Sequence, residues 1–175
     1  MQDAGRIFSE NIKNILDGTE EKIMNEIRRS GVFEYLLKNT GASKAEKERK
    51  LRSLNTLLHF RGLDCKQVLL LDREGNQFFY DYQNREMTLS EFKQREVYRE
   101  IAKKQTRLFP ARGCTIWRCY EDAMDEIYII KSYIDPNSLQ YCGMICLVVD
   151  RENFAKLLGE RSFEFTLYEE QGKLL

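Results

Sequence analysis

Residues 67–76 read QVLLLDREGN, and this stretch decides the fold because it has the pattern of a β-strand followed by a tight turn. Four consecutive apolar residues precede Asp72, and Gly75 stands one residue before the end of the polar segment. Glycine readily adopts the positive φ that tight turns require. A second run rich in aromatic residues, Phe78–Tyr82, follows directly. Together the two runs predict a β-hairpin.

A similar phrase, FTLYEEQGK, occupies residues 165–173 near the end of the chain. It repeats the order of apolar run, acidic residue and polar turn with glycine, and the chain stops at Leu175, right after this turn. We therefore expect three parts: an N-terminal helical region at residues 1–62, a sheet module at residues 63–160, and the start of a truncated second module at residues 161–175.

The first third of the chain has the apolar spacing of amphipathic helices. Apolar residues from Phe8 to Ile27 recur at multiples of three or four positions, which places them on one stripe of a long helix over residues 4–29. Gly18 is a soft point within it. A short helix is predicted at Val32–Lys38. Ser43-x-x-Glu46 is a capping box that begins a further helix, ending near Phe60.

From Gln67 onward the apolar period changes from that of a helix to that of a strand. After the hairpin, Thr88-x-x-Glu91 caps a helix that runs to about Lys104. Three more strands and a final helix capped by Asp150 complete the pattern; the strands are Cys114–Tyr120, Ile127–Ile134 and Tyr141–Val149. The order strand, strand, helix, strand, strand, strand predicts an α+β fold with an antiparallel sheet.

Charge and apolar content exclude several classes of protein. Lys plus Arg and Asp plus Glu number 28 each, so a large electrostatic footprint for nucleic acid is not expected. The longest apolar run, Met144–Val149, is far shorter than the roughly 20 residues that span a bilayer. We expect these residues to form a soluble fragment.

Catalytic and metal-binding patterns are absent from the sequence. It contains one histidine, His59, and has no Cys-x-x-Cys spacing, no His-Glu-x-x-His, no Gly-x-Ser-x-Gly and no Gly-rich loop with Lys-Ser/Thr. We therefore expect no enzyme activity in this fragment, no metal and no cofactor.

The five cysteines are predicted to be mainly small buried apolar residues. Cys114 and Cys119 are five positions apart on one strand, so they point to opposite faces. Cys142 and Cys146 lie about 13 Å apart along a strand, beyond the separation of about 7 Å that a disulfide tolerates. A cross-strand disulfide is the alternative.

Four segments carry a resemblance to a known family. They are VLLLDREGN at residues 68–76, Trp117 on the third strand, IIKSYIDP at residues 129–136, and GMICLVVD at residues 143–150 with a helix behind it. Their order and spacing resemble PAS-like Cache domains, the sensory ectodomains of bacterial membrane histidine kinases of the type paired with AraC-like response regulators. The resemblance covers roughly residues 6–160.

The resemblance implies a function and a location. In this family the long N-terminal helix descends from a transmembrane span, and the module senses a ligand on the extracellular side of the cell membrane. The resemblance also implies a homodimer through that helix and kinase activity in another part of the parent protein. An Arg-x-Trp-Tyr signature marks the members of this family that sense amino acids. In this sequence Trp117 is preceded by Thr-Ile and followed by Arg, so the resemblance does not imply an amino-acid ligand.

A candidate ligand site follows from pairing the strands on either side of residues 121–126. If Tyr120 pairs with Ile127, strand alternation places Arg118, Tyr120, Lys131 and Tyr133 on one face of the sheet. Two cations and two phenols on one face suit a sugar or an organic anion. The alternative is that this face is simply solvated.

Two more aromatic residues are candidates. Trp117, on the opposite face of the predicted hairpin, is either a core residue or a stacking wall for the ligand. Tyr98 lies on the helix that would roof the pocket.

Two other functions remain open at this point. One is a dimerisation or interaction module that binds no small molecule, which bulky side chains in the pocket would favour. The other is a cytosolic PAS or GAF sensor, because five cysteines fit a reducing compartment.

Overall fold

The structure is a computed structural model of the 175-residue chain. It describes residues 2–39, 41–60, 62–72, 74–82, 87–104, 115–134, 139 and 141–157. The second copy of the hairpin phrase, at residues 165–173, lies outside these residues. The truncated second module therefore stays a prediction.

Three helices form the first third of the molecule, as predicted. They are α1 (Gln2–Ser30), α2 (Val32–Lys38) and α3 (Lys44–His59). The capping box is present: Ser43 Oγ accepts from the Glu46 N–H at 3.3 Å, and the Ser43 N–H donates to the Glu46 carboxylate at 3.0 Å. These two bonds satisfy N–H groups that would otherwise lack partners in the first turn, so α3 begins where the sequence places it.

The five strands form one antiparallel sheet in the order β2-β1-β5-β4-β3. In chain order they are β1 (Cys65–Asp72), β2 (Gln77–Asp81), β3 (Thr115–Tyr120), β4 (Ala123–Ile134) and β5 (Tyr141–Asp150). This confirms the predicted α+β fold, with an antiparallel sheet and a long N-terminal helix.

The β1–β2 turn explains why the segment at residues 67–76 ends with an acidic residue followed by a polar stretch containing glycine. The Asp72 carboxylate accepts the backbone N–H groups of Glu74 and Asn76 at 2.9 and 2.7 Å, and the Asn76 side-chain amide at 2.6 Å. Gly75 has a φ of 87°, which an L side chain rarely adopts. The acidic residue and the glycine therefore close the hairpin locally, before any tertiary contact is needed.

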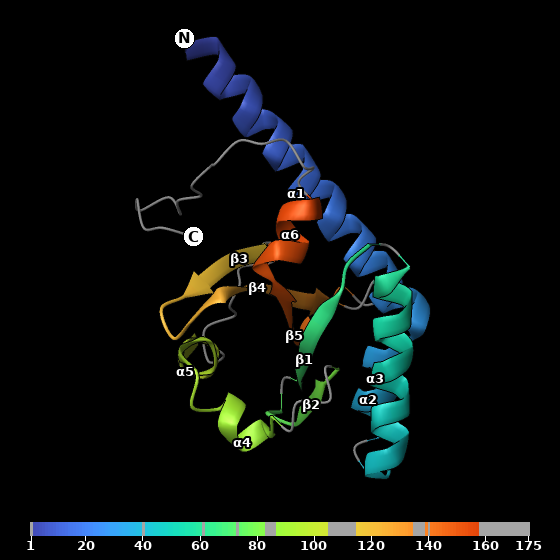
Figure 1. The fold of residues 1–175 in the computed structure, drawn as a ribbon. Helices are drawn as coiled ribbons and strands as arrows, with labels where there is room; N and C mark the ends of the chain where they lie inside the picture. Colours follow the sequence, from blue (N-terminus) through green and yellow to red (C-terminus); the bar gives the residue numbers. More distant parts are fainter. Residues whose placement is uncertain are drawn as a thin grey trace.

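Helices cover both faces of the sheet (Figure 1). The first face, which we call the α1–α3 face, packs against α1, α2 and α3. The second, the α4/α5 face, lies under α4 (Leu89–Phe92) and α5 (Glu96–Lys104). Alternation along β1 supplies both cores, because Val68 and Leu70 point to the α1–α3 face while Leu69 and Leu71 point to the α4/α5 face.

The predicted helical region shares a core with the sheet. Ile23 and Ile27 of α1 and Leu54 of α3 lie in one buried cluster with Val68 and Leu147 of the sheet. Apolar contacts therefore cross the expected boundary at residues 62/63. That boundary stays a prediction, but the described helices and sheet form one packed body.

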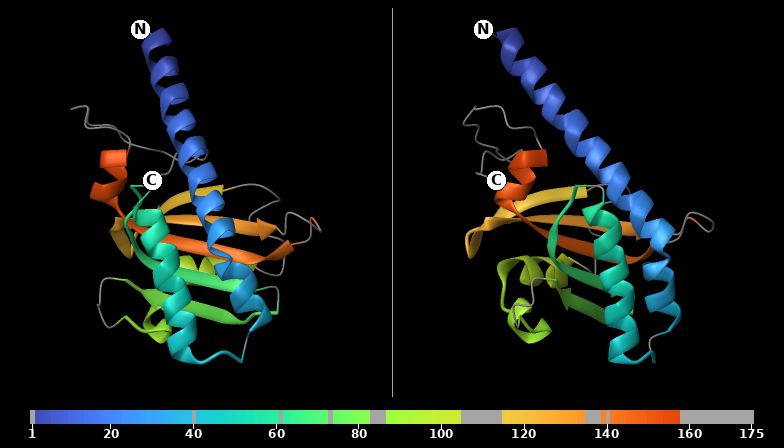
Figure 2. Two further views of the ribbon diagram at one scale, coloured as in Figure 1. Left: turned by 90° about the vertical axis from the view of Figure 1, so that its right-hand side faces the viewer. Right: turned by 45° about the vertical axis from the view of Figure 1, so that its right-hand side comes forward.

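The N-terminal half of α1 extends beyond the sheet in both views of Figure 2. On the same side, α6 (Arg151–Leu157) follows β5 and packs against β4 and β5. Among the described residues, no helix is both long enough and apolar enough to span a bilayer.

One predicted helix is divided. The sequence predicts one continuous helix from Thr88 to Lys104, but α4 ends at Phe92 and α5 begins at Glu96. The Thr88 capping box is nevertheless present, with the Thr88 N–H donating to the Glu91 carboxylate at 2.7 Å. Arg95, in the break between the helices, turns its side chain toward β4.

The described cysteines largely match the prediction of small buried residues. Cys65 and Cys146 are buried, whereas Cys119 and Cys142 are half-buried. Cys65, Cys119 and Cys146 are free thiols. Cys114 lies outside the described residues.

Candidate functional site

The predicted register of the β3–β4 hairpin is wrong by one residue. Arg118 pairs with Tyr128 instead of Ile129, and Trp117 pairs with Ile129. The connection is a two-residue turn at Glu121–Asp122, and an irregularity between Arg118 and Tyr120 brings Tyr120 opposite Ala123. A slip of one residue moves side chains to the other face of a sheet, so the predicted site is divided.

The candidate residues lie on opposite sides of the sheet. Arg118 and Tyr120 face α5, and Tyr98 is on α5 itself. Lys131 and Tyr133 face α1 and α2. Trp117 belongs to β3, but its side chain lies outside the described part of the chain. The expectation of one face bearing two cations and two tyrosines is therefore corrected, while a ligand-binding role for any single residue stays a prediction.

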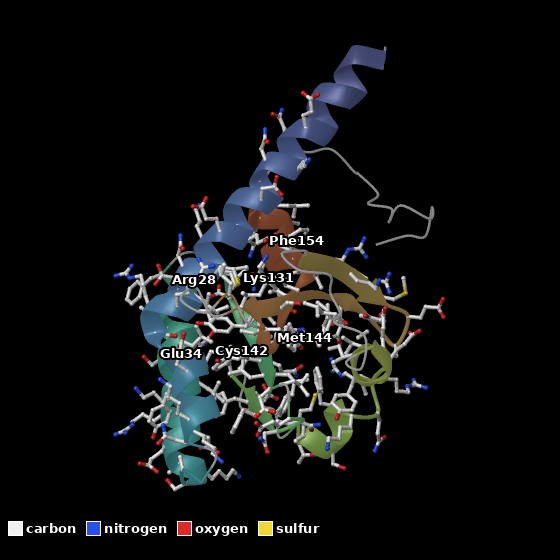
Figure 3. The ribbon with its side chains drawn as sticks, turned by 180° about the vertical axis from the view of Figure 1, so that it is seen from behind. Arg28, Glu34, Lys131, Cys142, Met144 and Phe154 are labelled. Atoms are coloured by element: carbon white, nitrogen blue, oxygen red, sulfur yellow. The ribbon has the colours of Figure 1, made fainter. Side chains whose placement is uncertain are left out.

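On the α1–α3 face, Lys131 and Tyr133 tie the sheet to the helices. The Lys131 ammonium pairs with the Glu20 carboxylate of α1, and the Tyr133 hydroxyl donates to Glu34 of α2. Figure 3 shows Lys131 close to α1 and Glu34 on α2. The Tyr133 ring also stacks on Phe33, with centroids 4.2 Å apart. Burial, followed by the bond to Glu34, raises the pKa of Tyr133.

On the α4/α5 face, Glu100 of α5 binds the candidate residues Arg118 and Tyr120. Arg118 donates to both of its carboxylate oxygens at 2.9 Å, and the Tyr120 hydroxyl donates to one of them. A bidentate guanidinium–carboxylate pair is among the stronger charged contacts in proteins. Burial, and then the bond to Glu100, raises the pKa of Tyr120, so the phenol stays a donor. An anionic ligand would have to displace Glu100 to reach Arg118.

Helix α5 is held at its start and along its length by polar contacts to the sheet. Its first N–H, that of Glu96, donates to the Asp122 carboxylate of the β3–β4 turn at 2.7 Å. The Gln77 side-chain amide of β2 donates to the Tyr98 hydroxyl at 2.7 Å. Because Tyr98 reaches β2 while Glu100 reaches β3, this helix spans the sheet from one edge strand to the other.

A charged network that was not predicted from the sequence lies at one end of the α4/α5 face. Glu126 is bound by Arg95, accepts from the Tyr128 hydroxyl at 2.7 Å, and lies 3.5 Å from the Lys66 ammonium. Lys66 also pairs with Asp150. The only sign of this network in the sequence is that Lys66 lies at the start of an apolar strand, and this does not identify the partners of Lys66.

The pKa values in this network follow from burial and charge. Burial lowers the pKa of Lys66, but the bond to Asp150 and the charges of Glu126, Asp150 and Asp125 outweigh burial and raise it overall. Burial and the bond to Glu126 both raise the pKa of Tyr128. Lys66 therefore stays charged and Tyr128 stays neutral near pH 7, which suits a structural network.

Between these polar groups, the described part of the layer under α4 and α5 is filled by apolar side chains. Phe92, Val97 and Ile101 are completely buried. Two amide oxygens in this region, Gln67 Oε1 and Gln77 Oε1, are buried and accept no hydrogen bond from any described residue. A buried acceptor without a donor costs free energy, so each marks a place where a ligand hydroxyl or amide would be favourable.

The described residues hold no cluster of three or more His, Cys, Asp or Glu side chains that could bind a metal ion.

A scan against protein-family models gave no match, and neither did a search of the curated proteins. Among solved structures, the sensory domain of the Campylobacter jejuni chemoreceptor Tlp3 is similar, with a TM-score of 0.42 and 12% identity over 98% of this chain and 72% of that chain. The complex of its ligand-binding domain with L-valine gives 0.42 and 12%, covering 98% and 71%. The form with isoleucine bound gives 0.41 and 13%, covering 98% and 70%. TM-scores below 0.5 do not establish a shared fold, so these three similarities carry no argument about function.

Proposed function

We propose that this chain is a PAS-like sensing domain on the extracytoplasmic side of a membrane, in which a ligand at the α4/α5 face acts through the sheet on α1. The observation that carries the proposal is the double attachment of β4. Tyr128 binds the charged network under α4 and α5, while Lys131, three residues further along, pairs with Glu20 of α1. One strand thus connects the two helical layers.

Helix α1 is suited to carry a signal because, among the described residues, it is packed against the sheet at its C-terminal half. Its C-terminal half is anchored by Ile23, Met24 and Ile27, all nearly or completely buried. Its N-terminal half extends away from the sheet (Figure 2). A small rotation or shift at the anchored end would therefore be passed along a continuous helix. A ligand that binds one arrangement of β4 better than another would shift the populations of these arrangements.

The polar groups favour a hydroxylated ligand over an organic anion. Both predicted cations already have carboxylate partners, Glu100 for Arg118 and Glu20 for Lys131. Gln67 Oε1 and Gln77 Oε1, both beneath α4 and α5, are among the buried acceptors that lack a donor from the described residues. Sugar and polyol hydroxyls are donors that could satisfy both atoms. We therefore propose a sugar or polyol as the ligand class, bound beneath α5.

The family resemblance supports the remaining parts of the proposal. It implies a homodimer formed through α1, a membrane anchor preceding α1, and a histidine kinase as the parent protein. These parts can be tested on a longer chain by light scattering and by autophosphorylation in membranes with and without the identified ligand.

A thermal-shift screen against sugars, polyols, organic acids, amino acids and nucleobases tests the ligand class. A ligand at 100 times its Kd adds about 2.7 kcal/mol, which raises Tm by about 5–11 °C for a domain of this size. Gln67→Met removes the buried acceptor while keeping side-chain volume, so it should abolish the shift without lowering Tm. Gln94→Met, at an exposed position, is the matched control. A sugar shift that survives Gln67→Met would overturn the proposed site.

One observation favours a second function, an interaction module without a small-molecule ligand. Phe92, Val97 and Ile101 fill the described part of the layer where a ligand would bind. If this function is correct, no compound shifts Tm, and light scattering shows a dimer that is lost when the exposed face of α1 is made more polar.

A further inference from the structure

A second hollow lies away from the α4/α5 face, between α1, the end of α3 and α6. Its volume is about 540 Å³, within the range of about 300–1,000 Å³ that is usual for small-molecule sites. Half of its twelve lining residues belong to α1. They are Asn14, Ile15, Gly18, Thr19, Lys22 and Ile23, and the others are Leu58, Gly62, Leu63, Asp64, Asn153 and Lys156.

The lining divides into apolar and polar parts. Ile23, Leu58 and Leu63 are buried and supply apolar surface. Lys22 of α1 and Lys156 of α6 are exposed, and within the described ranges neither ammonium has an ion-pair partner. Asp64, the only carboxylate in the lining, is bound by the His59 ring. The hollow therefore combines an apolar surface with two cations that a carboxylate could pair with.

Gly18 is an independent indication that this space is kept open. It lies inside α1, where glycine is less favourable than alanine by about 0.5–1 kcal/mol. A Cβ placed there would meet no atom within 4 Å, and Gly18 is not among the positive-φ residues. Neither the backbone nor neighbouring side chains explain the glycine. Its effect is to leave the wall of the hollow without a side chain.

We propose that this hollow, the α1/α6 site, binds a small organic anion whose apolar body lies against Ile23, Leu58 and Leu63 and whose carboxylate pairs with Lys22 and Lys156. The two lysines come from different helices. A bound carboxylate would therefore connect α6, which follows β5, directly to α1. This site is distinct from the sugar site proposed above and would act on the same helix.

NMR titration with hexanoate, and with hexanamide as the neutral probe of equal size, tests the proposal. Hexanoate at about 10 mM should shift amide signals of α1, α6 and the end of α3, with an apparent Kd of about 1 mM. Exposed ion pairs contribute modestly, so hexanamide should bind about fivefold more weakly. Equal binding of the two probes, or no shifts in these helices, would overturn the proposal.

Two variants separate the site from general effects on folding. Gly18→Leu fills the hollow with a strong helix former, so it should abolish hexanoate binding while Tm stays the same or rises. Lys22→Gln combined with Lys156→Gln should reduce hexanoate affinity to that of hexanamide and leave hexanamide unchanged. Lys13→Gln removes an exposed lysine of α1 outside the lining and should change nothing. Hexanoate binding that persists in Gly18→Leu contradicts the assignment.

The two proposed sites can fail separately. Gln67→Met should leave hexanoate binding intact, and Gly18→Leu should leave any sugar-induced shift in Tm intact. Loss of hexanoate binding in Gln67→Met would overturn the independence of the α1/α6 site.

Discussion

The two faces of the sheet are held in different ways. On the α1–α3 face, three helices and the sheet share a continuous apolar core that includes Ile27, Leu54 and Leu58, each completely buried. On the α4/α5 face, two short helices cover a smaller apolar cluster, and charged groups such as Glu100 and Glu126 lie at its margins. The same strands supply both faces.

The difference indicates which face can change shape. The apolar core under three helices is costly to open, whereas two short helices over a smaller apolar cluster with polar contacts at its margins open at lower free energy. Polar contacts also have directions, so they can be exchanged for contacts with a ligand. We infer that the α1–α3 face provides stability and that the α4/α5 face provides the response.

The largest expected effect compares two completely buried isoleucines, one under each layer. Ile27→Ala should lower the free energy of unfolding by about 4 kcal/mol, and Ile101→Ala by about 2 kcal/mol, because the short α5 can settle into the space that is left. Guanidinium denaturation measures both. Equal losses would contradict the distinction between the faces.

Lys66 tests the charged margin of the α4/α5 face. Lys66→Met leaves Asp150 and Glu126 without their shared cation and should cost about 3 kcal/mol at pH 7. Because the pKa of Lys66 is raised in the folded protein, its contribution is present below its unfolded pKa of about 10.4, and the cost of Lys66→Met should shrink as the pH rises above that value. The control is Lys44→Met, which removes a largely exposed lysine 3.8 Å from Glu48 and should cost under about 0.5 kcal/mol.

Alkaline pH should lower the free energy of unfolding through groups on both faces of the sheet. The pKa values of Tyr128, Tyr133 and the Cys146 thiol are raised by burial in the folded protein, so each group contributes stability below its unfolded pKa and loses it as the pH rises. The decline should begin near pH 8.5 for the thiol and near pH 10 for the tyrosines, at about 1.4 kcal/mol per pH unit and group.

Urea titrations between pH 7 and 11 measure this decline. Tyr128→Phe removes one of the titrating groups and should reduce the slope above pH 10. An unchanged slope in this variant would show that Tyr128 ionises as easily in the folded protein as in the unfolded one.

The smallest expected effects compare the two capping boxes, one on each side of the sheet. Ser43→Ala should cost about 1 kcal/mol of global stability because α3 is part of the main core. Thr88→Ala should cost about 0.5 kcal/mol globally, since α4 has only four residues and opens locally. Hydrogen exchange should show faster exchange confined to α4 in the second variant. A global change of the same size in both variants would contradict the comparison.

Features set by neighbouring residues could be predicted from the sequence. The turn closed by Asp72 and Gly75 and the caps at Ser43 and Thr88 depend on groups within four positions of one another. The strand at residues 67–72 was predicted from its own apolar run. The α+β class followed from the order of these elements. Helix α2 has the predicted bounds because a short apolar segment lies between two breaks.

The candidate site depended on contacts that are distant in the sequence. The division of the helix at Arg95 follows from its bonds to Glu126 and Tyr128, more than thirty positions away. The partners of the predicted cations were equally distant, since Glu20 is 111 positions from Lys131. No local pattern identifies such partners.

The sequence by itself determined the order of helical and strand segments, how the first hairpin turns, and which residues are apolar enough to be buried, because these follow from apolar spacing, short-range sterics and local hydrogen bonds. Only the tertiary structure decided which face each strand residue occupies. A one-residue shift in the β3–β4 register moved Arg118 and Tyr120 away from Lys131 and Tyr133. The physical reason is that successive side chains of a strand point to opposite faces of the sheet. The pairing register of β4 with its neighbours β3 and β5 therefore decides which side chains lie on the same face.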